Sequence, residues 1–150
     1  MDFSKLINEL SAEIGLSVVS DIISPFEIVV DALAVTLTQE DRGTGSSLVL
    51  SCLLGAIPEE HELDAYRVLL DANTFWNATA DCTLGVNAQT RQAYICYRIM
   101  DDGISGERLA DILESFVYVA GNWANFIEGL NEFDVEQGLQ LLDQNAFLRA

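Results

Sequence analysis

The sequence predicts an α+β fold in two layers, with the element order α-β-β-β-α-β-β-α and a twisted antiparallel sheet. Three observations predict this class. Three segments have the helical period of apolar residues, two groups of apolar strand-like runs lie between them, and turn residues separate the runs within each group. A length of 150 residues with no internal repeat or low-complexity linker indicates one domain over residues 1–150.

The first predicted element is an amphipathic helix over residues 2–15. Its apolar positions recur at spacings of three and four, and polar residues fall between them. Gly15 is a plausible stop. The apolar stripe consists of Phe3, Leu6, Ile7, Leu10 and Ile14.

Three consecutive antiparallel strands are predicted between Pro25 and Gly55. The apolar and β-branched runs are Phe26–Asp31, Val35–Leu37 and Ser47–Leu54. The segment Asp41–Gly45 has the composition of a hairpin turn between the second and third strands.

A second helix is predicted from Pro58, because proline suits a first helical turn and the two glutamates that follow lie at the positive end of the helix dipole. This helix ends near residues 73–76. A second hairpin follows, with one strand over residues 82–86, a turn at 87–90 and a strand at 91–99.

The clearest element is a long helix that Ser105 can cap and that keeps its apolar period to Leu130. Residues 131–150 carry at most a short, weak helix, which we interpret as a docked or flexible tail.

The composition excludes several classes of function. A formal charge of −17 repels nucleic acid backbones and anionic lipid surfaces, so we expect neither nucleic acid nor membrane as a partner. No signal peptide and no stretch that could span a bilayer is visible. This charge suits a protein that shows apolar surface to a partner and must resist self-association, although simple solubility explains it equally well.

The cysteines and the histidine do not form a recognisable catalytic or metal site. Cys52, Cys82 and Cys96 each lie in an apolar run and are interpreted as buried, reduced thiols of a cytosolic protein. No Cys-x-x-Cys pair exists, and His61 is interpreted as a solvated residue at a helix start. A cysteine enzyme would need a base beside its thiol. We therefore predict no enzymatic activity, no metal and no cofactor.

The ordered set of elements resembles the class I type III secretion chaperones, the Tir-chaperone (CesT-like) family. The resemblance begins at Leu69-Leu70-Asp71-Ala72-Asn73, which matches a Leu-Leu-x-x-Asn segment typical of the family. It continues through Leu84-Gly85 and covers roughly residues 2–130. The long helix matches at Leu109, Leu113, Phe116 and Trp123, and the chain departs from the family at Thr90-Arg91, where Thr-Gly is common.

The resemblance implies a homodimer in the bacterial cytoplasm that holds an N-proximal segment of a secreted effector in extended, export-competent form. It also suggests the secretion ATPase as a further partner. A regulatory adaptor or anti-activator of the same fold, which binds a transcriptional regulator, remains the alternative.

Candidate contact residues follow from the resemblance and the apolar pattern. The predicted effector-binding residues are Phe3, Leu6, Ile7, Leu10, Val35, Leu37, Leu48 and Leu50. The predicted dimer residues are Leu63, Tyr66, Leu70, Trp76 and Leu84. Each residue also has an ordinary interpretation as core, because alternation in a strand does not tell which face is buried.

Overall fold

The computed structural model describes residues 2–17, 22–41, 43, 45–76, 78–100 and 103–130, and it confirms the predicted α+β class and element order. The tail at residues 131–150 lies outside the described residues. The elements are α1 (Phe3–Glu13), β1 (Phe26–Val30), β2 (Leu33–Asp41), β3 (Ser46–Ala56), α2 (Glu62–Ala72), β4 (Thr83–Asn87), β5 (Gln92–Ile99) and α3 (Gly106–Gly129), with short 3-10 helices η1 (Glu59–His61) and η2 (Thr74–Trp76) on either side of α2.

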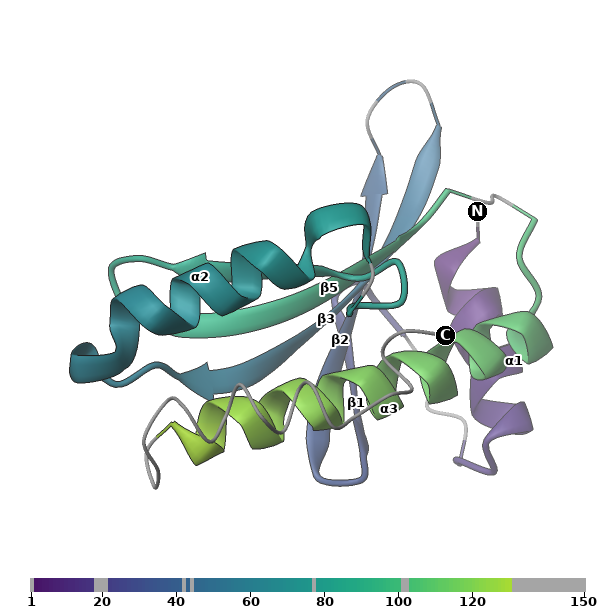
Figure 1. Ribbon diagram of the computed structural model, residues 1–150. Coiled ribbons are helices and arrows are strands. Elements are labelled where there is room, and N and C mark those ends of the chain that lie inside the picture. The colour runs from purple at the N-terminus through teal and green to yellow at the C-terminus, as the bar shows by residue number, and fades with distance from the viewer. Residues whose placement is uncertain are drawn as a thin grey trace.

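The five strands form one antiparallel sheet in the order β1-β2-β3-β5-β4. The two hairpins therefore meet through β3 and β5, and β1 and β4 are the two edge strands. Figure 1 shows α3 (green) running along the sheet with α1 (purple) across its first turns, while α2 (teal) lies apart from both helices.

The core lies between one face of the sheet and α3, with α1 packed on α3, and buried residues of α2 belong to the same cluster. Register pairs such as Val35 with Cys52 and Leu37 with Leu50 place their side chains on this covered face, where all four are buried. From α3, Trp123 is buried and its indole Nε1 donates a hydrogen bond of 3.1 Å to the carbonyl of Ala78. The loop before β4 is thereby tied to the core.

A close approach of two backbones positions α1 on α3. A Cβ atom at Gly106 would lie 2.6 Å from the backbone carbonyl carbon of Glu9, so only glycine fits at the first residue of α3. The Gly106 N–H donates to the Glu9 carboxylate at 3.2 Å, while Ser105 accepts from the N–H of Arg108. The start of α3 is thus satisfied partly by a side chain of α1.

The first hairpin corrects the predicted strand boundaries. Asp31 was predicted in the first strand, but Asp31 and Ala32 form a two-residue turn with φ of 49° and 67°. The strand that follows is longer than its apolar run Val35–Leu37, because antiparallel pairing with β3 continues through polar residues to Asp41. Neither residue of the turn is glycine, so the composition did not reveal it.

Two other boundaries differ by a few residues. The predicted helix at Pro58 begins as the 3-10 helix η1, and regular α-helix starts only at Glu62. Arg91 belongs to the second turn, with φ of 55°, and β5 begins at Gln92.

Candidate partner-binding surfaces

The structure buries all eight predicted effector-binding residues in the core of the protomer. The stripe of α1 packs mainly on α3, and the β2 and β3 residues point to the covered face of the sheet. None of these side chains is more than 6% exposed. Their direct contact with an effector stays a prediction, and the accessible apolar surface lies elsewhere. The residues are Phe3, Leu6, Ile7, Leu10, Val35, Leu37, Leu48 and Leu50.

An accessible, largely apolar groove lies between the end of α1, the β1–β2 hairpin and the outer side of α3. Its volume is about 960 Å³. Its exposed apolar side chains include Leu16 beyond α1, Val29 on β1 and Tyr118 on α3. Val29 is 67% exposed, which is unusual for a valine in the middle of a strand. Sequence reasoning missed this groove, although Ile14 at its border belongs to the predicted stripe.

The strand that borders the groove offers its backbone to a partner. Residues flanking a two-residue turn form a hydrogen-bonded pair, which here is Val30 with Leu33. Because such pairs alternate with non-bonded pairs, the N–H and C=O groups of Glu27 and Val29 point away from β2. β1 has no second neighbouring strand among the described residues. The groove therefore lies beside an open sheet edge.

The charged residues that line the groove are all acidic. Asp31, Glu114 and Glu128 line it and are exposed, and among the described residues that line it there is no lysine or arginine. Its wall also includes Asn122, whose Nδ2 is buried without a hydrogen-bond partner in the described part of the chain. These are the polar groups available to an occupant.

At the opposite sheet edge, which we call the closed edge, a side chain pairs with the backbone of β4 at Leu84. Asn73, at the end of α2, donates from Nδ2 to the carbonyl of Leu84 at 2.9 Å and accepts from the Leu84 N–H at 2.9 Å. The amide group thus takes the place of a further strand beside β4. Asn73 is the asparagine of the Leu-Leu-x-x-Asn segment, so the structure gives that segment a physical role.

The predicted dimer residues divide into exposed and buried groups. Leu63 and Leu70 are 62% and 69% exposed on the outer face of α2, Trp76 is 54% exposed and Tyr66 is half-buried. Leu84 is buried and points into the core, which makes it a poor candidate for a seam.

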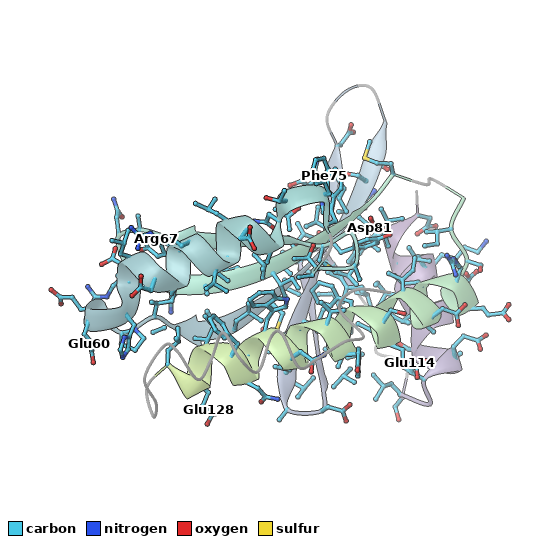
Figure 2. All side chains as sticks on the ribbon, viewed as in Figure 1. Glu60, Arg67, Phe75, Asp81, Glu114 and Glu128 are labelled. Carbon is cyan, nitrogen blue, oxygen red and sulfur yellow. The ribbon has the colours of Figure 1, made fainter. Side chains whose placement is uncertain are left out.

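Sequence reasoning missed one exposed apolar side chain beside these residues. Phe75 is 82% exposed, and Figure 2 shows it at the end of α2. Phe75 and Trp76 have φ of 55° and 54°, a conformation that costs non-glycine residues about 1–3 kcal/mol. The sequence signal was present as two adjacent aromatics directly after a helix end. We call Leu63, Leu70, Phe75 and Trp76 the α2 face.

Cys52 and Cys82 are buried as predicted, whereas Cys96 is only partly buried. Burial raises the pKa of Cys82 to about 12, and burial also raises the pKa of Cys52 and of Cys96. Thiolate, the nucleophilic form, is therefore scarce at neutral pH. Within the described ranges no group of acidic, cysteine and histidine residues is arranged to hold a metal ion.

The helices of the described chain do not reach the length and apolarity that a membrane span requires.

The model of the Tir chaperone protein (CesT) family matches residues 5–124. This chain belongs to that family. The match covers all five strands and α2, and it leaves out only the first two residues of α1 and the last five of α3. A comparison of this Tir chaperone family member with curated protein sequences found no match.

Solved structures show that the family member shares its fold with chains of three protein complexes. It resembles a chain of the ExsC–ExsE complex with a TM-score of 0.65 and 20% identity, covering 85% of this chain and 97% of that one. For the HopA1–SchA chaperone–effector complex the TM-score is 0.63 with 18% identity, covering 82% and 93%. For the ExoT–SpcS complex from Pseudomonas aeruginosa it is 0.60 with 15% identity, covering 81% and 97%.

Proposed function

We propose that this Tir chaperone family member is a type III secretion chaperone that binds an N-proximal segment of a secreted effector in extended form along β1. The observation that carries the proposal is the open β1 edge beside an apolar groove. Similarity to the HopA1–SchA chaperone–effector complex supports it at the level of fold.

The edge and the groove supply two kinds of contact that an extended peptide needs. Backbone pairing with Glu27 and Val29 gives affinity that does not depend on sequence, and alternate side chains of the peptide can enter the groove. A groove of about 960 Å³ lies at the upper end of the ~300–1,000 Å³ typical of ligand sites. The peptide stays unfolded while it is bound, and no covalent step is required.

The α2 face supports the proposal that the chaperone is a homodimer. Four large apolar side chains are exposed there, and a monomeric protein rarely leaves such a set in water. The face lies on α2 and η2, whereas the groove is lined by residues just after α1, by β1 and β2 with their turn, and by α3. A dimer formed through α2 therefore leaves both grooves accessible. We place this dimer in the bacterial cytoplasm and propose the secretion ATPase as the partner that receives the loaded complex.

A single backbone change tests the proposed site. Val29→Pro removes an N–H that points away from β2, so the sheet keeps its internal hydrogen bonds while an added strand loses one. Val29→Thr is the matched control, because threonine keeps the N–H and the β-branched shape.

The tagged chain and both variants would be expressed in secretion-competent bacteria, and captured proteins identified by mass spectrometry. We expect one dominant secreted partner, bound through its N-proximal region, retained by Val29→Thr and reduced about tenfold by Val29→Pro. Equal capture by both variants contradicts the β1 site. Capture of a transcriptional regulator in place of a secreted protein favours the adaptor alternative.

A further inference from the structure

We propose that the β1 groove selects its occupant by charge: it binds extended apolar segments that carry lysine or arginine and rejects acidic segments, including the β1 edge of a second copy of this chain. This inference rests on the proposed function, because it specifies the chemistry of the segment that the groove accepts.

The first support is the distribution of acids around the groove. Asp31 lies at the hairpin end of the edge, and Glu114 and Glu128 lie on α3, at separate turns of the helix in Figure 2. Glu27 adds a fourth exposed carboxylate on β1 itself. A segment lying along β1 therefore runs between acids on both sides.

The second support is that the part of the chain that the structure describes provides no cation for these acids. Every lysine and arginine within the described ranges already pairs with another carboxylate. The pairs are Lys5 with Glu9 at 3.8 Å, Arg67 with Asp64 at 3.2 Å, Arg91 with Glu59 at 3.7 Å, Arg98 with Glu40 at 3.0 Å and Arg108 with Asp111 at 3.7 Å. The groove acids thus remain available to basic side chains of a partner.

The third support is the effect of the same acids on self-association. An open edge with an exposed valine would invite pairing between two copies. Antiparallel pairing of two β1 strands would bring Glu27 and Asp31 of one copy near those of the other, and like charges across strands are destabilising. The acids therefore explain how the edge stays open to a partner without closing on a second copy.

Three synthetic nine-residue peptides test the inference. Each has the core Val-Thr-Val-Thr-Val, flanked on both sides by two lysines, two serines or two glutamates. Each is titrated into the ¹⁵N-labelled full-length chain, and the amide shifts of Val29–Leu33 and Gly121, which belong to the groove, are followed. Low and high salt are compared, because screening weakens exposed charge pairs.

Two triple variants test whether the groove acids cause the selection, and the second variant is the control for the first. The groove variant is Asp31→Asn, Glu114→Gln and Glu128→Gln, and asparagine tolerates the left-handed conformation of Asp31. The α2 variant is Glu60→Gln, Glu62→Gln and Asp71→Asn, which removes the same charge away from the groove.

We expect the lysine peptide to bind at least about tenfold more tightly than the glutamate peptide at low salt, from several exposed charge contacts together. The ratio should fall toward one in the groove variant and persist in the α2 variant. A ratio near one in the unmodified chain, or an equal loss in both variants, overturns charge selection.

The serine peptide separates this inference from the proposed function. If it shifts the groove amides while the charged peptides bind alike, the groove stands and only the selection by charge is wrong. If none of the three peptides shifts these amides, the proposed β1 site is itself contradicted.

Discussion

At one edge of the sheet the backbone of Leu84 on β4 is held by both polar atoms of the Asn73 amide, whereas at the other edge the outward groups of Glu27 and Val29 face a groove. The closed edge lies beside α2, and the open edge lies beside α1 and α3. An edge strand invites pairing with another chain unless something blocks it. This fold blocks one edge with a side chain and leaves the other for a partner.

The exposed groups at the two ends of the sheet suit different partners. Beside the closed edge the exposed groups are apolar side chains of the α2 face, which suit a second folded copy of the chain. Beside the open edge they are backbone groups and an apolar groove, which suit an unfolded segment. The dimer and the peptide site that we propose would need both, placed where they do not compete.

The largest expected effect comes from placing an aspartate at one end of the sheet or at the other. Leu70→Asp should weaken the dimer at least about 100-fold, roughly 3 kcal/mol, because an aspartate in an apolar seam is desolvated without a partner. Val29→Asp should leave the dimer intact and weaken binding of the extended segment. Light scattering measures dimer formation, and peptide titration measures binding at the groove. A dimer mass unchanged by Leu70→Asp would exclude this seam.

The second prediction opens the closed edge. Asn73→Ala removes two hydrogen bonds and leaves the N–H and C=O of Leu84 unpaired and partly buried, so we expect a loss of about 2–4 kcal/mol in the free energy of unfolding. The exposed neighbour Thr74→Ala should cost less than about 0.5 kcal/mol. Urea denaturation measures both, and hydrogen exchange should show faster exchange at the Leu84 amide only in Asn73→Ala.

The fold could be predicted from the sequence because the periods of apolar side chains are local signals. The stripe of α1 and the long period of α3 follow from neighbouring residues alone. Neighbouring residues alone do not show which face of a strand is exposed. Alternation at Val35 and Leu37 is equally compatible with either face, and only the packing of α1 and α3 decides which one is covered.

The sequence did not predict which strands form the two edges or how they are covered, and the reason is related. Strand order depends on pairing between β3 and β5, segments about forty residues apart, and no local pattern reveals it. Asn73 belonged to the segment that carried the family resemblance, but its partner Leu84 lies eleven residues further along the chain. Phe75 takes a positive φ that its residue type disfavours, so only the structure shows how far it is exposed.

The third prediction uses pH to probe the closed edge, since Cys82 precedes β4. Burial raises its pKa to about 12, above the value near 9 of an unfolded thiol. The native chain therefore keeps the proton between pH 9 and 12 while the unfolded chain loses it, and stability should fall as pH rises through this range. After allowance for partial solvation we expect a loss of about 1–2 kcal/mol by pH 11.

Denaturant titrations at pH 8 to 11 would measure this slope. Cys82→Ala should flatten it, because the group that titrates is gone. An unchanged slope in Cys82→Ala would show that other groups cause the alkaline loss and that Cys82 is more accessible than its place beside β4 indicates.

The smallest expected effect concerns the turn that presents the open edge. Ala32 has φ of 67°, and glycine adopts this conformation without the cost that a Cβ atom brings, so Ala32→Gly should stabilise the chain by about 0.5–1 kcal/mol. Ala34→Gly is the matched control, because the same change in the ordinary β2 backbone two residues later should destabilise by a similar amount. Thermal denaturation would resolve the opposite signs. If the turn only holds β1 in register, Ala32→Gly should leave peptide affinity unchanged, and a clear gain in affinity would instead show that the edge of the free protein is not yet fully formed.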